Sequence, residues 1–127
     1  MSLFDRFLST NSNAVPWKEL KTISDLEQAL ERSYEVPVAL FKHSISCGIS
    51  AMVKSQLEAE WDLEGQEIEI YYLDLINHRD VSNLIADKLG VWHQSPQVIL
   101  VKDGQAVYNA SHQAIRVSRI KSELAKG

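Results

Sequence analysis

Cysteine is nearly absent from this chain, which has 127 residues and contains one cysteine, Cys47. A disulfide-stapled secreted domain needs several cysteines, so that class of protein is not indicated. The chain also lacks the run of about 18 apolar residues that a membrane-spanning helix requires. Residues 1–8 contain neither an early basic cluster nor a long apolar segment, so we expect no signal peptide. These absences predict a cytoplasmic protein that does not associate with a membrane.

Concentrated positive charge and metal-ligand spacing are missing too. The formal net charge is −4, and the lysines and arginines are scattered without a basic stripe, so no nucleic-acid partner is expected. The four histidines and Cys47 are dispersed, so no metal site is expected. Apolar residues make up 45% of the chain and charged residues 24%, which is typical of a globular protein. We predict one domain over residues 1–127, with residues 1–16 as a weakly patterned N-terminal extension.

The single cysteine occupies a position with chemical consequences. An apolar segment, 38–41, predicts a buried strand before it, and Ile49, Met52, Val53 and Leu57 recur after it at helical spacing. Cys47 therefore lies where a strand ends and a helix begins. The first N–H groups of a helix have no partner inside it, and the helix dipole is positive there. Both features stabilise a thiolate, so Cys47 is the first candidate for a nucleophile, although a lone cysteine can also be a small buried hydrophobe.

A serine stands where a second thiol could have been. Residues 47–50 read Cys-Gly-Ile-Ser, and Ser50 lies one helical turn beyond Cys47. We expect its hydroxyl to donate a hydrogen bond to the sulfur. It cannot resolve a disulfide, so any redox cycle must pass through an intermolecular mixed disulfide.

The rest of the chain alternates predicted helices and strands. Helices are expected after a capping box at Ser24–Glu27, after Asn77 as N-cap with Gly90 just past the end, and after Ser111. Strands are expected at 17–23, 38–43, 67–74, 97–102 and 105–110, and the last two are joined by the turn Asp103-Gly104. This order predicts an α/β protein with a central mixed sheet of four to five strands flanked by helices. Sites in such sheets form beyond the carboxyl ends of strands, where Cys47 lies.

Four pieces of sequence together resemble the YtxJ family, the monothiol bacilliredoxins of the thioredoxin-like superfamily. They are Phe41-Lys42-His43-Ser44, Cys47-Gly48-Ile49-Ser50, Ser95-Pro96-Gln97 with the Asp103-Gly104 turn, and Ser111-His112. Two departures are Gly48, where many relatives are expected to have proline, and Ile45-Ser46, where a threonine and a polar residue are expected.

The resemblance implies a three-layer thioredoxin-like fold and a monothiol oxidoreductase that removes bacillithiol from protein mixed disulfides. Cys47 would be the nucleophile and Ser50 its support, and Ser95-Pro96 would be a cis peptide that presents its backbone to the substrate. Bacillithiol would be an exchanging co-substrate rather than a cofactor. The implied partners are bacillithiolated client proteins, a low-molecular-weight thiol and a bacillithiol disulfide reductase.

The neighbours of these motifs have competing interpretations. Gly48 and Ile49 are expected at the substrate surface. His43 either supports the thiolate or is a hydrogen-bonded structural residue. Lys42 either supplies positive potential to the site or is solvated. Trp92 either forms a wall of the substrate groove or packs in the interior.

Two other functions stay open. One is a non-catalytic thioredoxin-like binding module with a buried or regulatory Cys47. The other is a glutaredoxin-like iron–sulfur carrier, since Cys-Gly-Ile-Ser is close to the Cys-Gly-Phe-Ser of monothiol glutaredoxins. The glutaredoxin marks Thr-Val-Pro and Gly-Gly-x-Asp are absent, so this alternative ranks below thiol exchange.

Overall fold

The computed structural model describes residues 15–126, so most of the predicted N-terminal extension, residues 1–16, lies outside the described residues. The elements follow the predicted alternation. In chain order they are β1 (Lys18–Glu19), α2 (Ile23–Arg32), β2 (Val38–His43), α3 (Gly48–Glu60), β3 (Glu69–Asp74), α4 (Arg79–Leu89), β4 (Gln97–Lys102), β5 (Gln105–Ser111), the 3₁₀ turn η1 (His112–Ala114) and α5 (Val117–Ala125). No helix within residues 15–126 has the length and apolar character needed to cross a bilayer.

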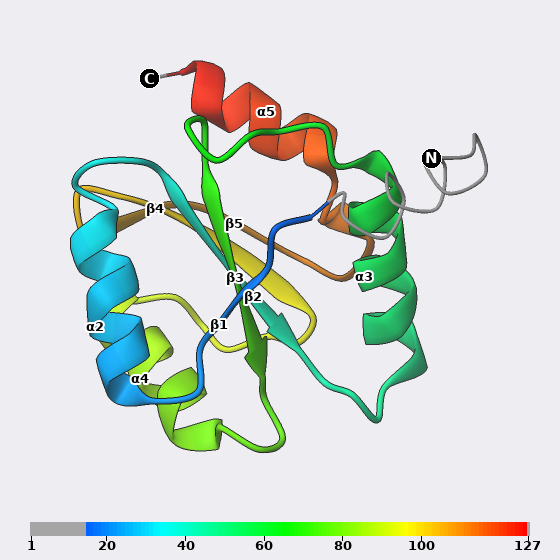
Figure 1. Ribbon diagram of the computed structural model, residues 1–127. Helices are drawn as coiled ribbons and strands as arrows, with labels where there is room; N and C mark the ends of the chain where they lie inside the picture. Colours follow the sequence, from blue (N-terminus) through cyan, green and yellow to red (C-terminus); the bar gives the residue numbers. More distant parts are fainter. Residues whose placement is uncertain (1–14, 127) are drawn as a thin grey trace, which may run out of the picture.

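Five strands form one mixed sheet in the order β1-β3-β2-β4-β5 (Figure 1). The β1–β3 and β3–β2 pairs are parallel, whereas β2–β4 and β4–β5 are antiparallel. Because β4 runs against β2, the end of β2 lies beside the start of β4, and Lys42 pairs with Gln97 there. This arrangement brings the segments after β2 and before β4 to the same edge of the sheet.

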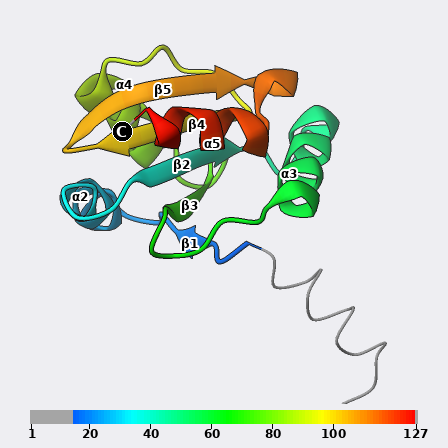
Figure 2. The ribbon, with the colours of Figure 1, turned by 90° about the horizontal axis from the view of Figure 1, so that it is seen from above.

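Helices cover both faces of the sheet, which confirms the predicted three-layer α/β fold. The alternation of strand residues explains the two layers, since successive side chains point to opposite faces. Ala39 and Phe41 of β2 pack in the cluster under α3 and α5, and Val38 and Leu40 pack in the cluster under α2 and α4. Figures 1 and 2 show α2 and α4 together on one side of the molecule and α3 and α5 on the other. β2 is therefore buried on both faces along its whole length.

Two predicted helix caps are wrong. The N-cap of α2 is Thr22 rather than Ser24, and Thr22 forms the capping box with Asp25. Asp25 also accepts the Lys21 backbone N–H, which fixes the earlier start of the helix. Asn77 does not cap α4 either, since His78 is the N-cap. The Asn77 side chain instead donates to the Asp74 carboxylate. The same carboxylate accepts the Ile76 backbone N–H, so it holds the turn after β3.

The predicted inward face of α3 is partly wrong. Its buried residues are Ser50, Val53 and Leu57, while Ile49 and Met52 are exposed. A helix can direct only one stripe at the sheet, and the stripe through Val53 and Leu57 includes Ser50 rather than Met52. The exposed apolar side chains therefore lie beside the start of α3, next to Cys47 in sequence.

The predicted glycine positions at two chain reversals are confirmed. Gly90 ends α4 in the left-handed conformation with φ of 65°. Asp103 and Gly104 both have positive φ, 51° and 75°, as a two-residue hairpin turn requires. The predicted strand from Glu67 starts later, at Glu69, because the Glu67 and Ile68 backbone N–H groups bond back to the Glu64 carbonyl in a turn.

Candidate active site

Cys47 is the N-cap residue of α3 and lies just beyond the carboxyl end of β2. Its backbone is extended, and its carbonyl accepts the first helical hydrogen bond, from Ala51. A turn closed by the Cys47 N–H and the Ser44 carbonyl separates it from β2. The residue is free of disulfides and half-buried, and its side chain makes no capping hydrogen bond. The sulfur is thus held at a helix N-terminus without a hydrogen bond to its first turn.

The Ser50 hydroxyl does not bond to the Cys47 sulfur in this structure, contrary to the prediction from the spacing. Ser50 is fully buried, and its Oγ lies 2.8 Å from His43 Nδ1. The same oxygen accepts a 3.1 Å hydrogen bond from the Ser44 backbone N–H. A hydroxyl has one proton and two acceptor positions, so these contacts occupy most of its capacity. Ser50 therefore fastens the start of α3 to the end of β2.

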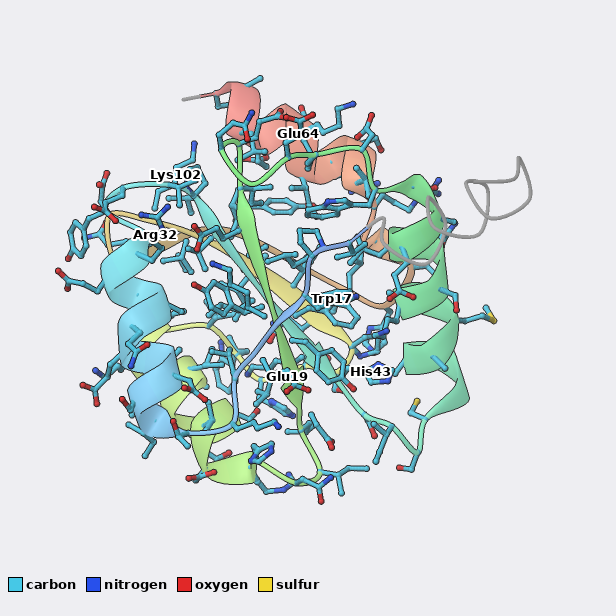
Figure 3. The ribbon with its side chains drawn as sticks, viewed as in Figure 1. Trp17, Glu19, Arg32, His43, Glu64 and Lys102 are labelled. Carbon is cyan, nitrogen blue, oxygen red and sulfur yellow. The ribbon has the colours of Figure 1, made fainter. Side chains whose placement is uncertain are left out.

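His43 lies inside the layer between the sheet and α3 (Figure 3) and is 6% exposed. Its ring stacks on Phe41, with centroids 6.0 Å apart, and tilts against Tyr72 at 5.5 Å. Burial lowers the pKa of His43 below its usual value, and the nearby Lys54 ammonium lowers that pKa further. The imidazole is consequently neutral at pH 7, and its tautomer depends on its partner, Ser50.

The loop with Ser95 and Pro96 faces the Cys47 segment across the edge of the sheet. The Ser95–Pro96 peptide bond is cis in the structure. The β2–β4 register pairs Phe41 with Val98 and Lys42 with Gln97, so its continuation runs from His43 toward Pro96. Ser95 Oγ is buried with no hydrogen-bond partner among the described residues. The backbone of Ser95 also makes no turn or loop hydrogen bond with the described backbone.

Trp92, Gly48 and Ile49 are all at the surface. The Trp92 side chain is 89% exposed, so the interior-packing alternative for this residue is wrong. Ile45, Ile49 and Met52 are further exposed apolar side chains around Cys47 in the sequence. The chain thus presents several apolar side chains in the segments that flank Cys47 and Pro96.

The solvated alternative for Lys42 is wrong, since this residue is 0% exposed. Its Nζ lies 3.4 Å from the Ser82 carbonyl and 3.3 Å from His93 Nδ1, and no carboxylate of the described residues pairs with it. Burial lowers the pKa of Lys42 to about 8. His93 also has a lowered pKa, first from burial and then from the Lys42 charge.

A second buried polar residue at this end of the sheet bonds to the loop before β4. Gln97, the β4 partner of Lys42, donates from Nε2 to the Trp92 carbonyl at 3.0 Å and accepts from the Gln94 N–H. Lys42 and Gln97 thus connect the sheet to the loop that carries Trp92 and Ser95.

The burial of Lys42 could have been predicted from the sequence, because a strand with apolar residues on both faces leaves no solvated position for it. Nothing local predicted Ser82 or His93 as its neighbours.

Within the described part of the chain, no group of three or more histidine, cysteine, aspartate or glutamate side chains could hold a metal ion. The described arrangement is one thiol, one buried hydroxyl and one buried imidazole on the α3 side of the sheet, beside a loop with unbonded polar groups. This arrangement can carry out thiol chemistry with one sulfur from the protein.

Comparison with known proteins places this site in a redox context. A family model described as monothiol bacilliredoxin BrxC matches residues 18–120. One similar solved structure is described as an oxidoreductase by attribution, with a thioredoxin fold. It is 32% identical to this chain with a TM-score of 0.74, and the match covers 90% of this chain and 96% of that one.

Two thioredoxins share the fold at lower identity. Thioredoxin from Fasciola hepatica is 17% identical with a TM-score of 0.66, covering 86% of this chain and 97% of that one. Thioredoxin from Malassezia sympodialis is 17% identical with a TM-score of 0.63, covering 85% and 87%. At these identities the likeness concerns the fold alone.

Proposed function

The chain belongs to the monothiol bacilliredoxin family, and from this premise we propose that Cys47 removes bacillithiol from mixed disulfides on proteins. The observation that carries the proposal is the position of the only cysteine, half-buried at the N-cap of α3 beyond the end of β2. Unpaired helix N–H groups favour a thiolate there. With no second cysteine in the chain, the product of attack is a mixed disulfide with another molecule.

The exchange balances in two steps. The Cys47 thiolate attacks the bacillithiol sulfur of the mixed disulfide, and the client sulfur leaves with the electron pair and takes a proton from water. A second bacillithiol thiolate then attacks the mixed disulfide on Cys47, which releases bacillithiol disulfide and regenerates the thiolate. A bacillithiol disulfide reductase would return that product to the thiol.

The surface around Cys47 supports a protein as the donor of the small thiol. Ser95 carries backbone groups without loop partners, which an extended client segment could bond. The exposed side chains of Ile49, Met52 and Trp92, in the segments that flank Cys47 and Pro96, supply apolar contact area.

Intact-mass analysis tests the proposal. Reduced protein is mixed with a client protein carrying bacillithiol, and separately with the same client carrying glutathione, and both partners are weighed over time. Transfer of bacillithiol to the chain, faster than transfer of glutathione and lost in Cys47→Ser, is the expected result. Ser46→Ala is a matched control, because Ser46 is exposed and its only hydrogen bond is a 3.4 Å contact to Ser44.

The other outcomes are also decisive. Equal transfer of both thiols would retain monothiol exchange and overturn bacillithiol specificity. Absence of any transfer, with alkylation of Cys47 no faster than that of an unfolded cysteine peptide, would favour the non-catalytic binding module. The exposed side chains of Ile45, Ile49, Met52 and Trp92 would then serve partner binding without chemistry.

A further inference from the structure

The Ser50 hydroxyl has two possible hydrogen-bond acceptors, His43 and Cys47. Its buried Oγ accepts the Ser44 N–H at 3.1 Å and lies 2.8 Å from His43 Nδ1. Cys47 and Ser50 are the N-cap and N3 residues of α3. In a capping box, the side chain at each of these two positions reaches the backbone N–H of the other, so the two residues are close neighbours. The single hydroxyl proton of Ser50 therefore has two candidate acceptors, the imidazole and the sulfur.

The protonation of one imidazole nitrogen decides between these acceptors. If Nδ1 of His43 carries no proton, it accepts the Ser50 hydroxyl, and the sulfur receives nothing from Ser50. If Nδ1 carries a proton, it donates to Ser50 Oγ. Both acceptor positions of the hydroxyl are then filled, by Nδ1–H and by the Ser44 N–H, so its proton must point elsewhere.

We propose that His43 is a positioning residue that acts on Cys47 through Ser50. When the Cys47 sulfur is a thiolate, His43 holds its proton on Nδ1 and the Ser50 hydroxyl turns to the sulfur. When the sulfur is bonded in a mixed disulfide, the Ser50 hydroxyl donates to an unprotonated Nδ1. The 2.8 Å separation of Ser50 Oγ and His43 Nδ1 permits either direction of donation. This inference rests on the proposed function and specifies how the leaving and attacking sulfur is stabilised.

The surroundings of His43 favour a change of tautomer over a change of charge. Lys54 on α3 lowers its pKa, while Asp74 on β3 and Glu58 on α3 oppose that effect. Phe41 and Tyr72 stack against the ring from β2 and β3. Since burial is the largest influence and favours the uncharged ring, the proton moves between Nδ1 and Nε2 through solvent exchange while the imidazole stays neutral.

Nitrogen NMR of the His43 ring tests the proposal on the wild-type chain without any substitution. The ring nitrogen shifts report the tautomer in two samples, one with Cys47 alkylated by iodoacetamide and one reduced at a pH where ultraviolet absorbance shows the thiolate. The expected result is a several-fold higher population of the Nδ1–H tautomer in the thiolate sample. An unchanged tautomer population would overturn the proposal.

A double-mutant cycle separates a path through Ser50 from a direct effect of His43 on the sulfur. Alkylation rates across pH are measured for His43→Gln, Ser50→Ala and the double variant, with Ser46→Ala as control. We expect Ser50→Ala to slow alkylation near neutral pH by about ten-fold, which is the size of one hydrogen bond to a charged group. His43→Gln should then add nothing in the Ser50→Ala background. Additive effects of the two substitutions would overturn the path through Ser50.

These readouts separate thiol exchange by Cys47 from the positioning role of His43. The mass assay with wild-type chain tests whether exchange occurs at all, and it does not depend on His43. Exchange by the wild type together with a fixed His43 tautomer would overturn only the positioning role. Absence of exchange would overturn the proposed function whatever the tautomer does.

Discussion

Lys42 and His43 are consecutive residues at the end of β2, and they lie on opposite faces of the same sheet. On the α3 face, His43 is held by a 2.8 Å contact with Ser50, which also accepts the Ser44 N–H. On the α4 face, the Lys42 ammonium has only 3.3 and 3.4 Å contacts and no carboxylate partner among residues 15–126. A close, neutral network thus lies beneath Cys47, whereas an incompletely paired charge lies beneath the proline loop.

This difference indicates how the two halves of the site are held. Neutral groups with short hydrogen bonds fix a geometry at low cost, while a buried charge without a counter-ion opposes folding. We infer that the Cys47 side is the rigid part of the site. The loop with Trp92 and Ser95 is attached through Lys42 and Gln97, so its attachment depends on the protonation of a lysine whose pKa is about 8.

The largest effect is expected on the α4 face, from Lys42→Met. The folded state binds the Lys42 proton less tightly than the unfolded chain does, since its pKa falls from 10.5 to about 8. The wild type is therefore destabilised fully below pH 8 and recovers stability as the pH rises toward 10.5. A shift of this size corresponds to about 3 kcal/mol. Methionine removes the charge at similar volume, so the variant should be at least as stable as the wild type at pH 7.

Urea unfolding at several pH values between 7 and 10 checks this prediction. The advantage of Lys42→Met should stay constant below pH 8 and shrink between pH 8 and 10. A difference between the two proteins that is independent of pH would show that the charge of Lys42 costs the fold nothing. Lys102→Met is a suitable control, because Lys102 lies on the adjacent strand β4, at the end away from the Lys42–Gln97 pair, and is only half-buried.

An intermediate effect is expected on the α3 face, from Ser50→Ala. This substitution leaves the Ser44 N–H and His43 Nδ1 without their partner in a buried position. The free energy of unfolding should fall by about 2 kcal/mol at pH 7, as for other buried polar groups that lose a partner. Hydrogen exchange at the Ser44 amide should also accelerate, because this N–H loses the Ser50 oxygen that accepts its hydrogen bond. Unchanged exchange at that amide would contradict the close network proposed for this face.

The smallest effect concerns the acid side of the stability curve. The pKa values of His43 and His93 are both lowered, so each folded imidazole releases its proton more readily than the unfolded chain. Stability is then present above the unfolded pKa and is lost as the pH falls below about 6.5 toward the folded values. Replacing either histidine with phenylalanine should flatten this decline. The larger flattening is expected for His43→Phe, since His43 is 6% exposed and His93 is an exposed residue.

Thermal melts between pH 5 and 7 measure both variants against the wild type. Equal slopes in all three proteins would mean that neither imidazole loses its proton affinity on folding. A larger flattening for His93→Phe would reverse the comparison and make the α4 face the more sensitive to acid.

Local patterns predicted most elements because hydrophobic periodicity and turn residues act within a few positions. The strands 38–43 and 97–102, the Asp103-Gly104 turn and the Gly90 helix end were all predicted with the observed positions. The caps at Ser24 and Asn77 were wrong, because several polar residues in a row compete for the same backbone groups. The local sequence does not determine which of these polar residues caps the helix.

The candidate site divides in the same way. The sequence by itself determined that the chain has one thiol, that it follows a strand and opens a helix, and that it can form only intermolecular disulfides. Only the tertiary structure decided that Ser50 bonds to His43 rather than to Cys47, and that Lys42 lies under α4 beside Ser82 and His93. Those contacts join β2 to α3, α4 and the loop before β4, and the direction of a buried polar side chain depends on partners that come from distant parts of the chain.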